Sequence, residues 1–352
     1  MKILYAIQGT GNGHLTRAYA MAAEFAQRED LKVDYLISGR SPSALFEMQA
    51  FGDFSWRQGL SFATRGGRVS LLGTVSKNPW LQFWQDVKEL NLSSYDLVVT
   101  DFEPVAAWAA KRQGVPCVGL GRQYAFQKHN HQLPINSLQR AMLKQFAPCD
   151  TAIGTHWQEV PELVPPLLGH ALNSAGHGRT AMDIGHFLVY LPFESLAKIK
   201  ELLAPFNNFR FSIFHPQATR MENAHCQYYP PSRQGFAEVF SQVQGVISNA
   251  GFETSSEALA LGKKLLVKPL SGQFEQYANA HCLAEHDLAS VMFGLDRECM
   301  SMWLRHAIPA QIKWPDIAPQ LVNWLADGAD EPVRSLSLRL WGQEKENRQA
   351  TA

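Results

Sequence analysis

The sequence predicts an α/β protein made of two domains that face each other across a cleft. Short apolar runs alternate with stretches of helical periodicity, first over residues 1–160 and again over residues 186–318. Between these halves, residues 161–185 are rich in Pro, Gly and polar residues, which is typical of a linker. A chain of 352 residues with 46% hydrophobic residues is long and apolar enough for two packed cores.

The first half predicts a parallel sheet with helices on both faces. Its strands are the runs KILYAI, KVDYLI, DLVVTD and PCVGLG, and its clearest helices span residues 14–27 and 104–113. Residues 40–90 are less regular. Because ligands of open α/β sheets bind beyond the carboxyl ends of the strands, the functional residues are expected where strands end.

The second half repeats this alternation. Its strands are HFLVYLP, FRFSIFHP, AHCQYYP, GVISNA, KLLVKPL and LASVMF, and its helices span residues 194–204, 235–243, 254–262 and 274–286. Residues 319–352 are predicted to be helical and to pack back on the first domain.

Charge and cysteine content exclude several classes of protein. Lys plus Arg and Asp plus Glu both number 32, and a net charge of zero argues against a nucleic-acid-binding protein that relies on global attraction. The five cysteines are scattered without a C-x-x-C pair, which fits a reducing compartment and neither a disulfide framework nor a zinc site. No signal-peptide pattern and no apolar run of about 18 residues is found, so the chain is expected in the cytoplasm, where it could lie on a membrane surface.

The glycines of "GTGNGH", residues 9–14, lie between the first strand and the first helix. Glycine lets a ligand approach the backbone, and the helix directs free N–H groups and its positive dipole end into the loop. The spacing is not the G-x-G-x-x-G of dinucleotide-binding proteins, the second strand ends without a carboxylate, and no Gly-Lys-Ser/Thr follows as in a P-loop. The loop therefore predicts an anionic or oxygen-rich ligand, and the alternative is a tight turn that needs glycine only for its geometry.

A second turn, "GFETSSE", follows the run GVISNA. Thr254 and Glu257 fit a T-x-x-E capping box. Alternatively, the turn at residues 248–251 receives a pyrophosphate at the helix N-terminus, while Glu257 accepts hydrogen bonds from two ribose hydroxyls. Glu275 and Gln276 begin a later helix, where they either face the cleft or form an ordinary solvated first turn.

Together these segments resemble a known family. The stretch "SNAGFETSSEALALGKKLLVKPLSGQFEQYANA" resembles the donor half of GT-B fold glycosyltransferases, and "GTGNGH" resembles their G-x-G-H or G-G-H start. The chain looks most like the inverting UDP-sugar enzymes, such as the N-acetylglucosamine transferase of peptidoglycan synthesis and the UDP-glucuronosyl and macrolide glycosyltransferases, and closest to a bacterial and archaeal branch with "EQYANA"-like segments. The resemblance implies two Rossmann-like domains that face each other across a cleft.

The resemblance also implies how the donor binds. The enzyme would transfer a hexose without a metal or cofactor, with a UDP-sugar as substrate and the helix dipole holding its diphosphate. The D-x-D triplet of metal-dependent enzymes is absent, and Asp101-Phe102-Glu103 is the nearest segment. Carried over to this chain, the donor-binding residues are Gly11, Gly13, Asn249, Gly251, Thr254, Glu257, Glu275, Gln276 and Phe236, with Asn279 as a helix-packing residue or a support of the phosphate loop.

His14 is the predicted catalytic base. An inverting transfer needs a general base opposite the leaving nucleotide, and an imidazole titrates near neutrality. Asp101, at the end of the strand DLVVTD, is expected to reach the first loop, fix the tautomer of His14 and stabilise the imidazolium. The alternative is that His14 only forms hydrogen bonds at a helix start.

The acceptor is expected to bind the irregular part of the first domain, and the loop at residues 121–134 is expected to line the same cleft. Trp80, Phe83, Trp84 and Val87 recur at helical spacing, which usually indicates core. Beside arginines, such aromatic residues also suit anionic lipid headgroups or an acidic or lipid-linked glycan. The predicted acceptor-binding residues are Arg17, Arg65, Arg68 and Trp84. The expected partners are thus a nucleotide sugar, an acceptor glycan, lipid or small molecule of the cell envelope, and the inner face of the cytoplasmic membrane, but no nucleic acid.

Two rival functions keep the same fold. A UDP-N-acetylglucosamine 2-epimerase shares the two-domain plan but needs additional carboxylates in the cleft and lacks the G-x-G-H start. A non-catalytic nucleotide-sugar-binding regulator would depend on Glu257 and be indifferent to the loss of His14.

Overall fold

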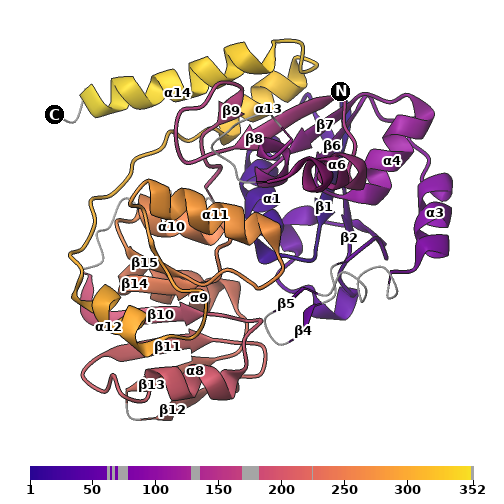
Figure 1. Cartoon of the computed structure of the whole chain (residues 1–352). Helices are drawn as coiled ribbons and strands as arrows, with labels where there is room; N and C mark the ends of the chain where they lie inside the picture. The colour runs from indigo at the N-terminus through magenta and orange to yellow at the C-terminus, as the bar shows by residue number, and fades with distance from the viewer. Residues whose placement is uncertain are drawn as a thin grey trace.

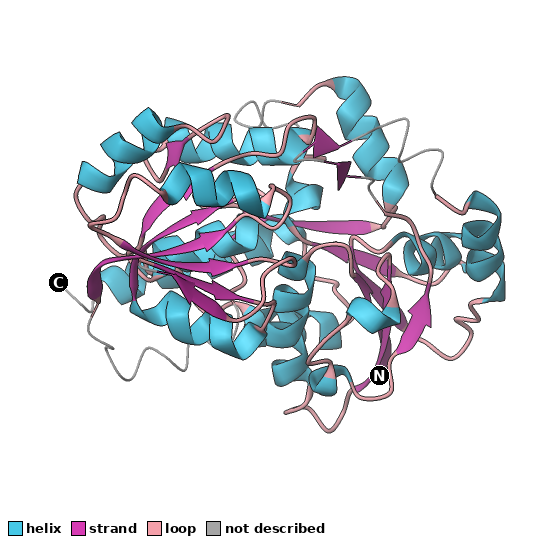
Figure 2. Ribbon diagram, turned by 90° about the horizontal axis from the view of Figure 1, so that it is seen from below, coloured by secondary structure: helices cyan, strands magenta, loops and turns pink. Residues whose placement is uncertain are grey.

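The computed structural model describes residues 1–61, 64–65, 68–69, 78–127, 135–168, 182–223 and 225–349, with no side chains for residues 64–65, 68–69 and 343–349. Most of the predicted linker and residues 128–134 of the predicted cleft loop lie outside this described part. Two seven-stranded sheets, each flanked by helices, lie beside one another (Figures 1 and 2). The α/β architecture with two sheets is the one that the sequence predicts.

The first sheet has the strand order β3-β2-β1-β6-β7-β8-β9, with all neighbouring strands parallel. Its central strands are buried on both faces, which explains why they read as continuous apolar runs rather than as alternating ones. The strands are β1 (Lys2–Gln8), β2 (Lys32–Ser38), β3 (Ser55–Arg57), β6 (Leu97–Asp101), β7 (Cys117–Leu120), β8 (Thr151–Thr155) and β9 (Leu163–Val164), and a separate ribbon pairs β4 (Thr64–Arg65) with β5 (Arg68–Val69).

The helices of the first half begin and end at local sequence signals. The start of α4 (Pro104–Gln113) is capped by Glu103, whose carboxylate accepts hydrogen bonds from the N–H groups of Val105 and Ala106. Gly114 ends the same helix in the left-handed conformation that favours glycine. The other helices are α1 (Asn12–Phe25), α3 (Trp80–Glu89), α5 (Arg122–Ala125) and α6 (Ser137–Phe146), with short 3-10 turns at Pro42–Ala44 and Gln49–Phe51.

The second sheet has the order β12-β13-β11-β10-β14-β15-β16, and only its edge strand β12 runs antiparallel to its neighbour. Its strands are β10 (Asp183–Tyr190), β11 (Arg210–Phe214), β12 (Met221–Asn223), β13 (Cys226–Tyr229), β14 (Val243–Ser248), β15 (Lys264–Val267) and β16 (Ser290–Val291). Its helices are α8 (Leu196–Leu203), α9 (Arg233–Gln242), α10 (Phe252–Ala260), α11 (Phe274–Glu285) and α12 (Arg297–Arg305).

Helix α10 begins two residues before the predicted helix 254–262, and the predicted capping box is wrong. Gly251 occupies the N-cap position in an extended conformation, and no side chain caps the helix. Thr254 therefore lies inside the first turn and cannot act as the N-cap. The first N–H groups of α10 are left without a side-chain partner.

The last two helices pack on the first sheet. Helix α13 (Ala318–Ala326) places Leu321 and Leu325 in the same core as Leu15 of α1, and α14 (Val333–Gln349) passes over β9 (Figure 1). The Trp341 Nε1–H of α14 donates a hydrogen bond of 2.7 Å to the carbonyl of Leu163. The domain boundaries named above stay a prediction. No helix within the described ranges is long and apolar enough to cross a bilayer.

Candidate functional site

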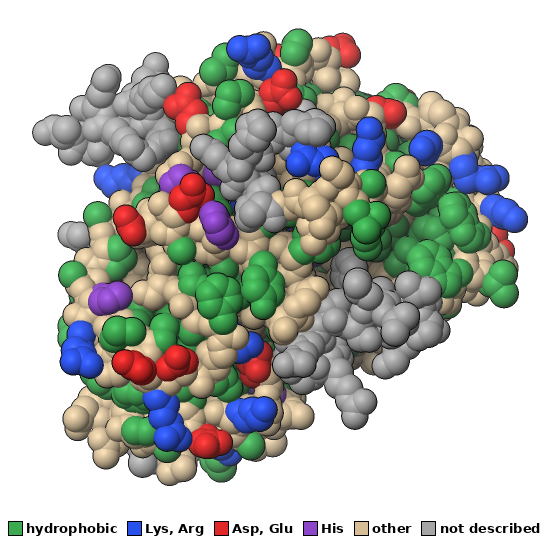
Figure 3. Space-filling view, viewed as in Figure 1, with side chains coloured by type: hydrophobic (Ala, Val, Ile, Leu, Met, Phe, Trp, Pro, Cys, Tyr) green, Lys and Arg blue, Asp and Glu red, His purple; other side chains and the backbone are tan. Residues whose placement is uncertain are grey.

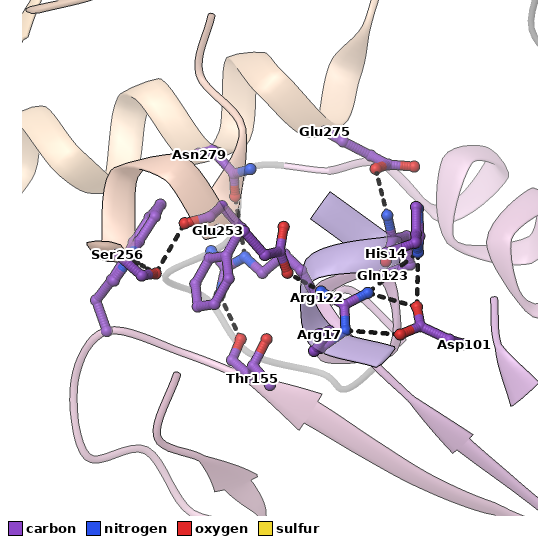
Figure 4. A network of polar contacts seen from close by, with 12 residues as sticks. His14, Arg17, Asp101, Arg122, Gln123, Thr155, Glu253, Ser256, Glu275 and Asn279 are labelled. Carbon is purple, nitrogen blue, oxygen red and sulfur yellow. Dashed lines mark hydrogen bonds and ion pairs between the residues drawn. The ribbon is translucent and has the colours of Figure 1, made fainter. Parts of the chain in front are cut away.

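A cavity of about 850 Å³ lies between the two sheets. Its walls come from the loops after β1 and β2 and from α5 on one side, and from α9, α10 and α11 on the other. This volume is in the range of small-molecule binding sites, and the carboxyl ends of parallel strands supply the walls, as expected for open α/β sheets. Helices α1 and α10 both begin at this cavity, and Figure 4 shows the polar residues between them.

The wall formed by α1 holds the two residues predicted to be catalytic. His14 lies in the first turn of α1 and lines the cavity, and its Nδ1 is 2.6 Å from Oδ1 of Asp101 at the end of β6 (Figure 4). A carboxylate only accepts hydrogen bonds, so Nδ1 carries the proton and donates a hydrogen bond to Asp101. The other ring nitrogen, Nε2, is then free to accept a proton when the imidazole is neutral.

Asp101 is completely buried, and Arg17 and His14 keep it ionised. Arg17 donates from Nε to Oδ2 at 2.9 Å and from Nη2 to Oδ1 at 2.5 Å. Burial by itself raises the pKa of Asp101, but the charges and hydrogen bonds of Arg17 and His14 outweigh it and lower the pKa below its usual value. The carboxylate that orients His14 is therefore charged at neutral pH.

Arg17 does not line the cavity, so its predicted role in acceptor binding is not supported. Its side chain is buried, and besides Asp101 its Nη1 forms an ion pair with Glu253 of α10 (Figure 4). Sequence reasoning missed Glu253. An acidic residue in the first turn of a helix is common because it complements the helix dipole, and nothing in the sequence indicates the partner across the cleft.

The opposite wall is built around the start of α10. Asn279 of α11 donates a hydrogen bond to the carbonyl of Ala250 at 3.1 Å, and Asn249 donates to the carbonyl of Lys268 at 2.9 Å. These contacts hold the turn before Gly251 in place. Gly251 and Thr254 line the cavity, so the uncapped N–H groups of the first turn are close to any ligand bound there.

Glu257 and Phe236 also line this wall. Burial raises the pKa of Glu257 to about 7, although the nearby charge of Arg233 acts in the opposite direction. The Phe236 ring on α9 packs edge-on against the Tyr190 ring at 5.2 Å between centroids. Arg233, which sequence reasoning did not single out, lines the cavity with its guanidinium over the ring of Tyr19.

The two predicted sugar-binding residues in the first turn of α11 have different hydrogen-bond partners. Glu275 accepts a hydrogen bond of 3.2 Å from Nε2 of Gln123, a residue of α5 in the first half, and burial raises the pKa of Glu275 to about 7. Gln276 uses its Oε1 to accept a hydrogen bond from the N–H of Leu270 at 2.8 Å. The amide nitrogen of Gln276 and the second lone pair of its Oε1 are therefore left for a ligand.

Arg122 was not predicted to be a site residue. It belongs to α5 and is buried, and it donates hydrogen bonds to Asn279 Oδ1 at 2.9 Å and to the Thr155 carbonyl at 2.8 Å. Its guanidinium lies about 5 Å from the centroid of the Phe252 ring of α10. Helix α5 thus contacts both α10 and α11 across the cleft. Its first residues belong to the predicted cleft loop.

The remaining acceptor predictions divide into two groups. Trp84 lies on α3 in edge-to-face contact with Phe83 and Trp108, and it is not among the residues that line the cavity. The side chains of Arg65 and Arg68 lie outside the described residues. On the acceptor side the cavity is instead lined by Arg40, whose Nη1 donates to Asn12 Oδ1 at 2.9 Å.

Several polar atoms of the cavity wall are buried without a hydrogen-bond partner in the described part of the protein. They include Arg122 Nη2, Gln123 Oε1, Asn249 Oδ1 and Gln273 Oε1. Leaving such atoms unsatisfied costs about 1–3 kcal/mol each, so their concentration here points to a polar ligand. Among the described residues, no group of three or more His, Cys, Asp or Glu side chains is arranged to hold a metal ion.

Comparison with known proteins gives a family and a fold. The profile of Glycosyl transferase family 1 matches residues 1–309 of the chain. The chain is similar to the solved structure of Acinetobacter baumannii MurG, with 16% identity, a TM-score of 0.54, and coverage of 93% of this chain and 99% of that one. No curated protein sequence matches it.

Two plant structures are also similar. A UGT transferase from Siraitia grosvenorii in complex with UDP has 13% identity and a TM-score of 0.54, covering 97% of this chain and 99% of that one. Phytolacca americana UGT2, complexed with UDP-2fluoro-glucose and pterostilbene, has 12% identity and a TM-score of 0.60, with coverage of 97% and 99%. The likeness confirms the predicted GT-B fold, while the narrower resemblance to the "EQYANA" branch stays a prediction.

Proposed function

The chain belongs to glycosyl transferase family 1 and is a glycosyltransferase, and from that premise we propose that it moves a hexose-type sugar from a UDP-sugar to a hydroxyl acceptor with inversion and without a metal. One observation carries this proposal. His14 and the uncapped start of α10 line the same cavity from opposite walls. A base and a site for a leaving diphosphate on opposite sides of a sugar are what inversion requires.

In this proposal the donor lies on the second half of the chain. The N–H groups at the start of α10 hold the diphosphate, where the helix dipole favours negative charge. Glu257 accepts hydrogen bonds from the ribose hydroxyls, and the Phe236 ring lies beside the uracil. Glu275 and the amide nitrogen of Gln276 bind hydroxyls of the transferred sugar. The two similar plant structures contain UDP or a UDP-sugar, which supports uridine as the nucleoside.

The chemistry follows from the His14–Asp101 pair. Nε2 of His14 takes the proton from the acceptor hydroxyl while that oxygen bonds to the anomeric carbon of the sugar. The bond from this carbon to the diphosphate oxygen breaks, and UDP leaves with its negative charge stabilised at the start of α10. The Asp101 carboxylate stabilises the imidazolium until the proton passes to solvent.

The donor proposal is tested by thermal stabilisation of the purified protein with nucleotides and UDP-sugars in excess chelator. A ligand at about 100 times its Kd adds roughly 2.7 kcal/mol of stability. UDP and one UDP-sugar are expected to raise the Tm, and Glu257→Ala is expected to abolish the effect. A shift by nucleotides of another base only, or by none, would overturn the donor assignment.

The same protein with the identified UDP-sugar separates the rival functions. Transfer to an added hydroxyl acceptor, with UDP released, supports the proposed reaction. Conversion of the free donor into an epimer without any acceptor would instead support an epimerase. Binding without turnover, unaffected by His14→Ala, would support a nucleotide-sugar-binding regulator.

We also propose that the acceptor is presented at the inner face of the cytoplasmic membrane. Trp80, Leu81 and Trp84 on α3 are exposed by 44%, 91% and 38%, and Figure 3 shows hydrophobic side chains gathered over this helix with Lys and Arg side chains beside them. Lys88 lies in the last turn of α3, and Lys111 lies 5.0 Å from the ring centroid of Trp108. Tryptophan with basic neighbours suits the interface of an anionic bilayer and an acceptor anchored there.

This membrane contact is tested by sedimentation with lipid vesicles. Leu81→Glu is expected to abolish binding to vesicles that contain anionic lipid, because it places a charge at the centre of the exposed surface. The matched control is Leu338→Glu on α14, where Leu338 is exposed by 59%. Equal binding by both variants, or no preference for anionic lipid, would contradict the proposal.

A further inference from the structure

Arg17 joins the two walls of the cavity. Its Nε and Nη2 donate to Asp101 in the first sheet, and its Nη1 pairs with Glu253 in the first turn of α10. All three nitrogens of the guanidinium are therefore used, and two of them act on the carboxylate that orients His14. The side chain of Arg17 is exposed by only 2%, so water cannot readily replace either partner.

The helix starts fit together closely at this point. A Cβ atom on Gly13 of α1 would lie 2.6 Å from Oε2 of Glu253, which is closer than a side chain allows. Glycine at position 13 thus lets Glu253 reach Arg17 over the backbone of α1. Gly11, the N-cap of the same helix, has no such neighbour, and its nearest contact would be His14 at 3.6 Å.

Because of the position of Glu253, its ion pair with Arg17 affects how the donor binds. Its carboxylate belongs to the helix start where the proposed diphosphate binds, and it lines the cavity. An unpaired carboxylate there would repel the diphosphate, because like charges a few ångströms apart cost more at a partly buried site than in water. Arg17 offsets part of this charge, because its one positive charge is shared between Glu253 and Asp101.

We propose that Arg17 and Glu253 are positioning residues of the transfer reaction, which tie the donor-binding helix α10 to the helix that carries the base. When α10 rests on α1, Glu253 fixes Arg17, Arg17 fixes Asp101, and Asp101 fixes the ring of His14. Occupation of the donor site is thereby linked to the orientation of the base. This inference rests on the proposed function for the identity of the donor and of the base.

The test compares Glu253→Gln with Glu298→Gln in protein labelled with ¹⁵N-histidine. Glu298 is the matched control, because it is also in the first turn of a helix, α12, and is exposed. His14→Ala assigns the His14 ring signals in the NMR spectrum. In the absence of nucleotide, Glu253→Gln is expected to shift or broaden those signals, and Glu298→Gln to leave them unchanged. Unchanged signals in Glu253→Gln would overturn the inference, and this comparison does not depend on the donor.

With UDP present, the wild-type His14 signals are expected to respond to the nucleotide. In Glu253→Gln the nucleotide is expected to bind at least as tightly, because a negative charge has been removed, while the response of His14 is lost. A response equal to that of the wild type would contradict the link between donor and base. If UDP does not bind even the wild type, the donor proposal fails and the nucleotide-free comparison alone decides the inference.

A double substitution distinguishes pairing from simple structural support. Arg17→Met takes the guanidinium away from both Glu253 and Asp101, and the unpaired Glu253 is expected to weaken UDP binding about tenfold, which corresponds to 1.4 kcal/mol. Arg17→Met/Glu253→Gln is expected to recover UDP binding to within about threefold of Glu253→Gln, since the carboxylate beside the diphosphate is gone and Asp101, at the other wall, keeps its hydrogen bond to His14. Equally weak binding by both Arg17 variants would show that Arg17 only supports the structure.

Discussion

The two helix starts that face the cavity, at α1 and α10, are alike in backbone and different in side chains. Each follows a parallel strand, and each has a glycine N-cap with no side-chain cap. At α1 the polar groups are paired, because His14, Asp101 and Arg17 satisfy one another. On the α10 side, Glu257 faces the cavity and the Asn249 Oδ1 atom is buried without a partner in the described residues.

This difference suggests how the work is divided between the two walls. A preformed network holds its groups in one geometry before any substrate arrives, which is what acid–base chemistry requires. Free N–H groups and a desolvated carboxyl raise the free energy of the unliganded protein, and a ligand that forms hydrogen bonds with them removes this cost. Apart from Arg17 and Glu253, which join the two walls, we therefore expect substitutions on the α1 wall to change the reaction rate, and substitutions on the α10 wall to change donor binding.

The largest expected effect is on the α1 wall. His14→Ala is expected to lower the rate of UDP release from the UDP-sugar in the presence of acceptor by about 10²–10⁴-fold, because the proton acceptor is lost. UDP affinity is expected to stay close to that of the wild type. His281→Ala, on the exposed face of α11, is the control and is expected to be neutral. A proportional loss of UDP binding would break the division between the walls.

On the α10 wall, Glu257→Gln is expected to weaken UDP binding at pH 8 by roughly 10–100-fold, since hydrogen bonds to a charged group are worth about 1.5–3 kcal/mol. The pKa of Glu257 is raised to about 7 by burial, so at pH 6 most of the wild-type carboxyl is already protonated. The difference between wild type and variant is therefore expected to shrink at pH 6. Calorimetric titration at both pH values checks this, with the exposed Glu238→Gln as control. A difference independent of pH would show that the Glu257 charge plays no part.

A stability effect is expected from Glu275, the desolvated carboxyl on α11. Its pKa is about 7 in the folded protein, so the folded state holds a proton that the unfolded state releases above the ordinary glutamate pKa. The stability that this proton gives is present at pH 4 and is lost as the pH rises through 7. Glu275→Gln is expected to raise the free energy of unfolding at pH 8 by about 1–3 kcal/mol and to have little effect at pH 4.5.

Denaturant melts at the two pH values measure this change, and the exposed Glu285→Gln on the same helix is the control. His156 contributes in the opposite sense, because burial lowers its pKa to about 3 and the unfolded state binds its proton first. Since both proteins contain His156, its contribution cancels in the comparison. Equal destabilisation of Glu275→Gln at both pH values would contradict a desolvated carboxyl.

The smallest expected effect tests how closely the starts of α1 and α10 approach each other. Gly13→Ala is expected to lower the free energy of unfolding by about 1 kcal/mol, because the methyl group meets Glu253, although the gain in helix propensity offsets part of this cost. Gly11→Ala is expected to cost no more than about 0.5 kcal/mol, because the backbone is extended and the added Cβ meets only His14 at 3.6 Å, an ordinary contact distance, so that only the preference for glycine at an N-cap is lost. Thermal melts of the two variants are compared. Equal stability would show that the helix starts do not approach as closely as described.

Much of the fold was predictable because it depends on local patterns. The runs DLVVTD and KLLVKPL are continuous and apolar, which is the pattern of strands buried on both faces. The first forms β6 at the centre of its sheet, and the second forms the buried β15, which lies between β14 and the edge strand β16. Helix 104–113 was predicted with its observed bounds, since Pro104 and Gly114 mark its two ends. The start of α10 was misplaced, because a T-x-x-E pattern also occurs inside a first turn.

The candidate site was predictable where one residue follows a strand end. His14 and Asp101 follow or end neighbouring parallel strands, so the topology alone brings them to one edge of the sheet. Trp84 is different, because its position outside the cavity lining could not be predicted from the chain. Its helical spacing identifies an amphipathic helix, but the spacing does not say which surface that helix occupies in the protein.

By itself, the sequence determined the alternation of strands and helices in two halves, the glycine-containing turns that precede α1 and α10, and the pairing of a histidine with a strand-end aspartate. Only the tertiary structure decided that Arg17 pairs with Glu253, that Gln123 reaches Glu275 and that Gln276 supports its own loop. The physical reason is the distance along the chain over which each kind of interaction acts. Backbone periodicity and capping are local properties that a sequence displays directly. Pairing between side chains of two separate sheets depends on how these sheets pack together, and no local pattern records that packing.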